Sequence, residues 1–392
     1  MREAGVREMG AETPLPRLEV AELRHVRLPM VVPFETSMGR LNERDAFLIR
    51  LRADGLEGWG EAAAWRDPSF SYETVETCFY AAERYLLPLL FSAAQPAARG
   101  IDSLLTPVRG YPMAKAALET AAADLAARAQ GISLSRWLGG SSAEVIVGIS
   151  LGIEASHEAL LGRIEQAVAK NYRRAKIKIR PGWDLAVVEA IRRRWPDLPI
   201  SVDANSAYTL ADRELFKALD AHGLVTIEQP LRHDDLVDHA DLQSGLVTPV
   251  CLDESLASLA DLEAAIRLKS CRMVNLKPGR VGGLRQSLAV HDLCHDQGLA
   301  LFCGGMLETG IGRAANLAIA SLKHFRIASD LSESARYFAR DLVDPPFRLT
   351  ERGTLAVPAG PGIGVTIDEG ELERRTVTCH SFTRSELAGA QA

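Results

Sequence analysis

Hydrophobic and polar positions follow two different periods in the first part of the chain. Within residues 18–62, the segment DAFLIRLRADGLEGWGEAA contains two alternating stretches joined by Asp54-Gly55, a dipeptide typical of a tight β-hairpin. Residues 72–138 are rich in Ala and Leu at helical spacing, and MAKAALETAAADLAARAQG predicts a long amphipathic helix that stops at Gly131. We therefore predict an N-terminal α+β capping domain over residues 1–142.

From Glu144 onward, short β-rich stretches alternate with helical ones. The predicted strands are EVIVGIS, RAKIKI, PISVDA, TIEQP, TPVCLDE, MVNLKP and LALFCG, with a weaker one at HFRIAS. Their starts recur about every 25 residues, and βα units of that length favour a parallel sheet closed into a barrel. The alternative is an open doubly wound sheet, which predicts a Gly-rich turn where the chain reads LGIEASHE. We place the barrel at residues 143–335 and expect residues 336–392 to return to the first domain.

Charged residues end four consecutive predicted strands. They are Asp203, Glu228, Asp253 and Lys277, separated by 25, 25 and 24 residues, or one βα unit each. Successive strand ends are neighbours around one rim of a barrel, so we expect the three carboxylates to converge on one point. A single acid at a strand end is usually a helix cap or a solvated charge, but three in register need a cation to stay ionised together. Oxygen-only ligands indicate Mg²⁺ or Mn²⁺ rather than zinc.

The stretch RAKIKIRPGWD carries cations on one face of a predicted strand. Lys176 and Lys178 are two residues apart, so their side chains point the same way, about 7 Å apart. Alone, this pattern favours a solvated strand edge. Beside three carboxylates, with Lys277 across the rim, it indicates removal of a proton from a carbon next to a carboxylate. We expect Lys176 and desolvation to lower the pKa of Lys178, which would act as the base.

Composition narrows the class of protein. The chain has 392 residues, 47% hydrophobic and 24% charged, with a net charge of -6. We therefore expect no nucleic-acid or anionic-membrane partner, no transmembrane helix and no secretory signal in MREAGVREMGAETPLPR. The six cysteines form no CxxC pair, so we interpret them as reduced thiols of a cytoplasmic protein.

Six segments resemble the enolase superfamily in its muconate-lactonizing subgroup, nearest to the o-succinylbenzoate synthase and N-acylamino acid racemase family. They are KIKIRPGWD, VDANSAYTL, IEQPL, CLDES, VNLKPGRVGG and GGMLETGIGRAANLAIAS. The resemblance covers nearly the whole chain and implies an α+β cap on a (β/α)₇β barrel. It implies that Mg²⁺, or Mn²⁺ in its place, is held by Asp203, Glu228 and Asp253. It also implies that Lys178 and Lys277 act on opposite faces of a small carboxylate substrate.

The same resemblance implies further roles. Lys176 would help to hold the substrate carboxylate, and Asn205 and Glu254 would support the ligands from behind. The residues expected to line the substrate cavity are Ser150, Gly304, Gly305, Met306, Glu308 and Thr309. Loops 32–40 and 62–73 would close over the distal end of the substrate, with Phe34, Ser37, Trp65 and Arg66 as candidates. Trp65 and Arg66 depart from the family pattern, so the substrate stays open.

Several functions remain as alternatives. The resemblance implies o-succinylbenzoate synthesis, a syn-dehydration of a cyclohexadiene carboxylate in menaquinone biosynthesis, and also permits N-acylamino acid racemisation. A dedicated racemase or another muconate-cycloisomerase-like enzyme is the alternative within the family. Outside it, GISLG matches GxSxG with Ser150 at its centre, which would indicate a serine hydrolase, and a non-catalytic barrel is a further alternative. We expect a homo-oligomer.

Overall fold

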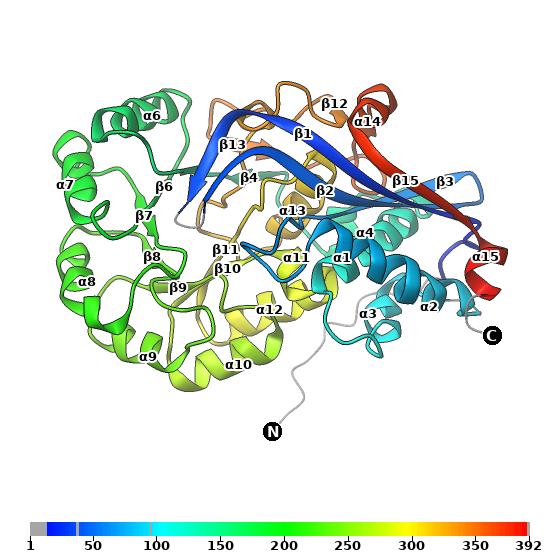
Figure 1. Cartoon of the computed structure of the whole chain (residues 1–392), viewed down its shortest axis with the longest axis horizontal. Helices are drawn as coiled ribbons and strands as arrows, with labels where there is room; N and C mark the ends of the chain where they lie inside the picture. Colours follow the sequence, from blue (N-terminus) through cyan, green and yellow to red (C-terminus); the bar gives the residue numbers. More distant parts are fainter. Residues whose placement is uncertain (1–13, 37–38, 95, 390–392) are drawn as a thin grey trace.

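An antiparallel sheet forms the core of the cap, the α+β part of the molecule. The computed structural model describes residues 14–36, 39–94 and 96–389. The sheet has the order β15-β1-β2-β3 and consists of β1 (Val20–Thr36), β2 (Gly39–Ala53), β3 (Leu56–Ala62) and β15 (Thr376–Thr383). Asp54 and Gly55 have φ angles of 51° and 75°, so the predicted hairpin turn is confirmed. β15 brings the C-terminal segment to the outer edge of this sheet (Figure 1).

Within the described part of residues 75–138, five α-helices accompany the sheet. They are α1 (Val75–Ala81), α2 (Leu87–Ser92), α3 (Ile101–Leu104), α4 (Pro112–Ala129) and α5 (Leu134–Leu138). α4 packs against β3 at Gly58 and Gly60, where an added Cβ would lie about 2 Å from backbone oxygens of α4. The prediction of an amphipathic helix is wrong, because α4 is buried on nearly every side between the sheet and the rest of the molecule.

The second part is a parallel barrel. Its sheet has the order β11-β10-β9-β8-β7-β6-β5. The strands are β5 (Ile149–Leu151), β6 (Ala175–Lys178), β7 (Ile200–Asp203), β8 (Thr226–Glu228), β9 (Val250–Leu252), β10 (Met273–Leu276) and β11 (Ala300–Cys303). The intervening helices are α6 (His157–Ala169), α7 (Leu185–Arg194), α8 (Arg213–Asp220), α9 (Val237–Ser244), α10 (Leu259–Leu268), α11 (Pro278–Val281), α12 (Leu284–Asp296) and α13 (Gly310–Ala320). Figure 1 shows α6–α10 outside the strands, as a barrel requires.

Two residues close the ring. Ser329 forms a parallel bridge with Val147 beside β5, and Asp330 forms one with Gly304 at the end of β11. This closure confirms the barrel and excludes the open doubly wound sheet. The weak strand expected at HFRIAS is wrong in extent, because only its last residue, Ser329, pairs, together with Asp330 beyond it.

The remaining elements lie outside the two main sheets or at their edges. The predicted strand EVIVGIS is split: β4 (Glu144–Ile146) pairs antiparallel with β13 (Thr354–Ala356), and only β5 belongs to the barrel. β12 (Val343–Asp344) pairs with β14 (Thr366–Ile367), and α14 (Glu369–Arg375) and α15 (Arg384–Gly389) flank β15. The exact boundaries at residues 142 and 335 stay a prediction.

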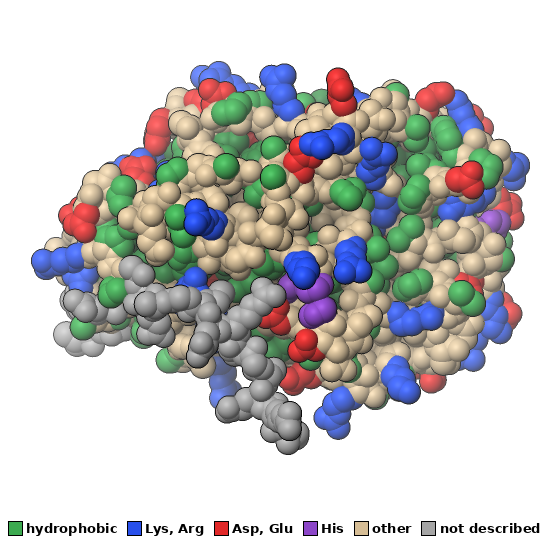
Figure 2. All heavy atoms as spheres, turned by 180° about the vertical axis from the view of Figure 1, so that it is seen from behind, with side chains coloured by type: hydrophobic (Ala, Val, Ile, Leu, Met, Phe, Trp, Pro, Cys, Tyr) green, Lys and Arg blue, Asp and Glu red, His purple; other side chains and the backbone are tan. Residues whose placement is uncertain are grey.

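The surface has a mixed character. On the face in Figure 2, basic and acidic side chains are scattered among hydrophobic and other atoms rather than gathered by sign. Within the described residues, no helix is both long and apolar enough to cross a membrane.

Candidate active site

The three predicted carboxylates lie at the carboxyl ends of neighbouring barrel strands. Asp203 ends β7, Glu228 ends β8, and Asp253 follows β9 directly. Lys178, Asp203 and Glu228 stand side by side in the strand register. All three carboxylates are buried, none more than 1% exposed. The repeat of one βα unit therefore brings together side chains far apart in the sequence.

Each carboxylate forms an ion pair with a buried cation. Lys178 Nζ lies 2.7 Å from Asp203 Oδ2, and Lys176 Nζ lies 2.7 Å from Glu228 Oε1. Lys277 Nζ lies 2.8 Å from Asp253 Oδ2. Acids and lysines thus form one charged cluster, and the three lysines of this cluster line a cavity.

Oxygen atoms in this cluster fit a hard divalent cation. Glu228 Oε2 is buried and has no hydrogen-bond partner, which is costly unless a cation satisfies it. The donor set of Asp203, Glu228 and Asp253 contains only oxygen, as Mg²⁺ prefers. Among the described residues, no three acidic, histidine or cysteine side chains converge tightly enough to form a complete metal site. The expected convergence thus holds for the strand ends, while the carboxylates themselves are turned toward lysines and Arg280.

Burial and mutual repulsion separate the pKa values of the acids. Burial raises the pKa of Glu228 to about 8, and the nearby Asp203 carboxylate adds to the rise. Burial opposes ionisation of Asp203, but Lys178 and Lys176 outweigh it and lower its pKa well below the usual range. Arg280 and Lys277 likewise outweigh burial and hold the pKa of Asp253 at about 2. One acid of the three therefore keeps a proton at neutral pH unless another cation compensates its charge.

A column of cations fills one face of β6. Arg174, Lys176 and Lys178 alternate with buried apolar residues, so all three point into the barrel. Asp330, in the closing segment, lies 2.5 Å from Arg174 Nη2 and 2.6 Å from Lys176 Nζ. Burial would lower the pKa of Lys176, but Asp330, Glu228 and Asp203 raise it well above its usual value. Lys176 is therefore held as a fixed cation.

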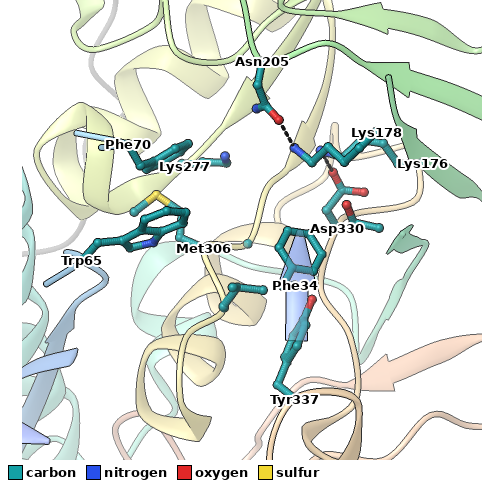
Figure 3. A pocket seen from close by; sticks show the side chains of 13 residues that line it. Phe34, Trp65, Phe70, Lys176, Lys178, Asn205, Lys277, Met306, Asp330 and Tyr337 are labelled. Atoms are coloured by element: carbon teal, nitrogen blue, oxygen red, sulfur yellow. Dashed lines mark hydrogen bonds and ion pairs between the residues drawn. The ribbon is translucent and has the colours of Figure 1, made fainter. Parts of the chain in front are cut away.

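Lys178 and Lys277 point toward each other from opposite sides of the cavity (Figure 3). Lys178 Nζ also donates to Asn205 Oδ1 at 2.6 Å, and Asn205 Nδ2 donates to Glu254 Oε1 at 2.7 Å. Gly304 leaves room for the second lysine, because an added Cβ would lie 2.9 Å from Lys277 Cε. The arrangement can present one amine to each face of a flat substrate.

Apolar side chains cover the cavity opposite the charged cluster. Trp65 and Phe70 stack with ring centroids 5.0 Å apart, and Phe70 lies 5.4 Å from Lys277 Nζ. Figure 3 shows Met306 beside this pair and Phe34 and Tyr337 along another wall. The apolar lining consists of Phe34, Trp65, Phe70, Met306, Leu307 and Tyr337. An apolar wall limits the water that reaches a bound substrate, and electrostatic interactions are stronger where water is excluded.

Most predicted cavity residues line the cavity. These are Phe34, Trp65, Ser150, Lys176, Asn205, Gly305 and Met306. Ser37 lies outside the described residues. Glu254 is behind the cavity, beside Asn205. Gly304 lies beside Lys277 Cε and is not itself in the lining.

Three further predicted residues lie outside the cavity lining. Arg66 is exposed and is not in the cavity lining. The Glu308 carboxylate accepts from Met306 N at 2.8 Å and from Asn316 Nδ2 at 2.9 Å, so it stabilises the loop rather than lining the cavity. Thr309 caps α13 and donates its hydroxyl to Glu61 at 2.6 Å. Leu307, which has a left-handed φ of 62° and lines the cavity, separates Met306 from these two residues.

Sequence reasoning missed several residues of the site. Asp330, Phe70, Leu307 and Tyr337 line the cavity, and Arg280 forms an ion pair with Asp253. Arg280 follows Lys277 by one helical turn, a spacing that could have indicated it. The other four lie in loops or in the two-residue closing segment, which carry no period.

The alternative based on GISLG does not match this geometry. Ser150 lies within β5, in register with Lys176, rather than at a sharp turn between a strand and a helix. No histidine is among the residues found to line the cavity in the described part of the chain. A serine hydrolase site of this kind is therefore not formed.

Comparison with known proteins identifies the family. Residues 19–139 match the mandelate racemase / muconate lactonizing enzyme N-terminal domain, and residues 159–371 match the enolase C-terminal domain-like family. An o-succinylbenzoate synthase of Geobacillus kaustophilus is 45% identical over 372 residues, covering 95% of this chain and 99% of the relative. An N-succinylamino acid racemase of Thermus thermophilus is 45% identical over 361 residues, covering 92% and 98%.

Solved structures agree with this assignment. A member of the enolase superfamily from Listeria innocua is 40% identical, has a TM-score of 0.90 and aligns over 94% of this chain and 99% of its own. The matched families together span both the cap and the barrel. The chain belongs to the enolase superfamily, in the group of mandelate racemase and muconate lactonizing enzymes.

Proposed function

We propose that this enzyme removes a proton from the carbon next to a carboxylate of a small substrate and passes through an enediolate. The observation that carries the proposal is that Lys178 and Lys277 face each other across one cavity, each paired with a buried acid at a strand end. Two amines on opposite faces suit proton transfer at one carbon. The relatives named above, a synthase and a racemase, are enzymes of the same superfamily and support this chemistry.

Asp203, Glu228 and Asp253 would hold Mg²⁺, with Mn²⁺ as a substitute, because their oxygen donors are buried and one is unpaired. When bound, the ion supplies positive charge that stabilises a negatively charged carboxylate group of the substrate. Lys176, held by Asp330, adds a fixed positive charge beside it. If the substrate carboxylate points toward these charges, the α carbon of the substrate lies between Lys178 and Lys277.

In dehydration, the Lys178 amine accepts the α proton and then returns a proton to the departing hydroxyl, which leaves as water. The Lys277 ammonium stabilises the negative charge of the enediolate from the other face. In racemisation, one lysine removes the α proton and the other delivers a proton to the opposite face. Both lysines are present and both types of relative are equally similar, so we propose o-succinylbenzoate synthesis together with N-succinylamino acid racemisation.

The apolar wall is expected to receive the distal part of the substrate. Trp65 and Phe70 replace water there, while Arg66 faces solvent. A cytoplasmic location is part of the proposal, supported by the absence of disulfides in the described part of the chain. The small-molecule carboxylate partner and the homo-oligomeric state stay predictions.

Two assays on one preparation test the proposal. The purified enzyme with Mg²⁺ is incubated with the cyclohexadiene carboxylate precursor, and aromatic product is followed by absorbance. In parallel, single enantiomers of N-succinylamino acids are incubated in D₂O, and loss of optical rotation and deuterium uptake are followed. Turnover in both assays supports the bifunctional proposal. Turnover in only one assay means that the enzyme catalyses only that reaction. An enzyme that is folded and metal-loaded yet inert in both assays, including deuterium exchange, would refute the proposal.

A further inference from the structure

A buried carboxylate of the cap is bound to the start of a barrel helix. Glu61 is the next-to-last residue of β3 and is 8% exposed. Its Oε1 accepts from Thr309 N at 3.0 Å, and its Oε2 accepts from Thr309 Oγ1 at 2.6 Å and from Gly312 N at 2.9 Å. A carboxylate at this position is favoured, because a helix N-terminus presents unsatisfied N–H groups and a partial positive charge.

The other amides of this helix start are satisfied from different parts of the molecule. Gly310 N donates to Asp341 Oδ1 at 2.7 Å, and Ile311 N donates to the Thr309 hydroxyl at 3.3 Å. Gly312 has no side chain, which leaves room for the Glu61 carboxylate. A Cβ added at this position would lie 2.9 Å from Glu61 Oε2. Glu61 therefore links the cap to the start of α13, where the glycine at position 312 leaves space for its carboxylate.

This link joins two walls of the substrate cavity. Four residues after Glu61, the same cap segment delivers Trp65 to the cavity. Directly before Thr309, the loop of residues 304–308 delivers Met306 and Leu307. Trp65 and Met306 lie next to each other in Figure 3. The bonds of Glu61 hence fix how far the cap wall stands from the barrel wall.

We infer that Glu61 is a positioning residue that sets the width of the apolar end of the cavity and so the fit of the distal part of the substrate. It touches neither the charged cluster nor the reacting carbon. Its loss should weaken substrate binding more than the proton-transfer steps. The inference rests on the proposed function for its kinetic consequence, but the structural link can be tested without turnover.

The chain offers a matched control in Glu119. This buried residue of α4 accepts from Leu284 N at 2.8 Å and from Arg285 N at 3.0 Å, so it binds the start of α12 from the cap in the same manner. In the described part of the chain, none of residues 278–299 is found in the cavity lining. Glu119→Gln therefore breaks an equivalent link between cap and barrel away from the apolar wall.

The experiment compares Glu61→Gln with Glu119→Gln in the full-length, Mg²⁺-loaded enzyme. Each amide presents an N–H₂ group to backbone N–H donors, so both variants should unfold at a lower temperature than the parent. Amide hydrogen exchange of residues 304–312 should increase in Glu61→Gln and stay at the parent rate in Glu119→Gln. KM for an N-succinylamino acid should rise about tenfold in Glu61→Gln, equivalent to about 1.4 kcal/mol of binding, with kcat changed far less. Glu119→Gln should leave KM unchanged.

A milder variant covers the case in which Glu61→Gln does not fold. Thr309→Val keeps the Thr309 backbone bond but removes both the 2.6 Å contact to Glu61 and the hydroxyl that accepts from Ile311 N. Exchange is therefore compared over residues 304–308 only, where it should rise, together with KM, by less than in Glu61→Gln. Equal exchange at residues 304–312 in the two Gln variants, or a fall in kcat without a rise in KM, would overturn the inference. If the parent enzyme turns over none of the substrates, the proposed function fails, and the exchange comparison alone decides whether the link exists.

Discussion

Lys176 Nζ lies 2.6 Å from Asp330 Oδ2 and 2.7 Å from Glu228 Oε1, so one lysine joins the closing segment of the barrel to the acid cluster. Asp330 also neutralises Arg174, which stacks over Phe302 with its guanidinium carbon 4.4 Å from the ring centroid. Two buried cations thus share one carboxylate. The position of the Lys176 charge therefore depends on the segment that closes the barrel as well as on β6.

Replacement of Asp330 by Asn should damage both stability and turnover. Breaking a buried ion pair by removing one partner costs about 3–5 kcal/mol, because the other charge is left uncompensated. A displaced Lys176 should lower kcat/KM by up to about 10²-fold, the cost of a misplacement of about 1 Å in an active site. Urea unfolding and steady-state kinetics measure the two effects.

Asp124→Asn is the control for that variant. Asp124 is also fully buried and pairs with Arg128 at 2.9 Å, but it lies within the cap on α4. It should lose comparable stability and keep the parent kcat/KM below its unfolding temperature. If Asp330→Asn has parent-like kinetics, Lys176 does not depend on Asp330 for its position.

Trp65 and Arg66 form a natural pair for testing the cap wall. Trp65 stacks on Phe70 in the cavity, whereas Arg66 is exposed. Trp65→Ala should raise KM for a substrate with a bulky distal group about three- to tenfold, because an aromatic contact contributes about 0.5–1.5 kcal/mol beyond its buried area. The rate of α-proton exchange at saturation should be spared. Arg66→Ala should match the parent in both measurements, and equal kinetics for the two variants would mean that Trp65 only packs against Phe70.

Periodicity explains which parts of this molecule were predictable from sequence. Asp203, Glu228 and Asp253 recur at the interval of one βα unit, and the barrel converts that interval into spatial proximity. The alternation around Lys176 and Lys178 likewise specified their common direction. These signals are local and regular, so the fold, the lysines and the acids could all be inferred.

Residues outside a regular period could not be placed in this way. Asp330 lies in a closing segment whose pairing involves only two residues, so no alternation marks it. The family resemblance placed Glu308 and Thr309 in the cavity, but both lie outside its lining, after the left-handed residue Leu307. Phe70 reaches the site from a cap loop, and its position depends on packing between distant segments. Tertiary contacts decide such positions.

Divalent metal should be required for turnover. Exhaustive chelation should abolish activity, and Mg²⁺ or Mn²⁺ should restore it. Asp253→Asn replaces one carboxylate oxygen by an amide nitrogen and removes a negative charge, so it should weaken Mg²⁺ binding by at least about tenfold, measured by calorimetry, while circular dichroism shows an intact fold. Full activity after chelation would remove the metal from the proposal.

Glu119 should make stability depend on pH. Burial, the largest cause, raises its pKa to about 8, whereas an unfolded glutamate has a pKa of about 4.3. Between these values the folded chain holds a proton that the unfolded chain has released. The contribution of Glu119 to stability is therefore complete below about pH 4.3 and is lost as pH rises through about 8, by up to about 1.4 kcal/mol per pH unit.

Glu119→Gln removes this titration. The free energy of unfolding of the parent minus that of the variant should decrease as pH is raised from 5 to 8, as measured by urea titrations at each pH. A difference that stays constant over this range would show that Glu119 is ionised throughout, with its charge satisfied by the start of α12.

The last prediction separates the two lysines, which stand on opposite sides of the substrate plane. In dehydration both proton transfers use one face, so Lys178→Ala should remove the base and nearly all activity. General base catalysis contributes about 10²–10⁴-fold, and the lost acid role adds to this. Lys277→Ala should also be severe, because the cation that stabilises the enediolate is lost. Loss of dehydration alone therefore does not distinguish the lysines.

Isotope exchange in D₂O with single enantiomers of an N-succinylamino acid does distinguish them. In Lys277→Ala, Lys178 should still exchange the α proton of the enantiomer that presents it to β6, without inversion. In Lys178→Ala, any surviving exchange should be confined to the opposite enantiomer. Mass spectrometry gives deuterium uptake and chiral chromatography gives inversion on the same samples. Equal exchange of both enantiomers by either variant would mean that one lysine reaches both faces, contrary to the opposed arrangement of Lys178 and Lys277 in the cavity.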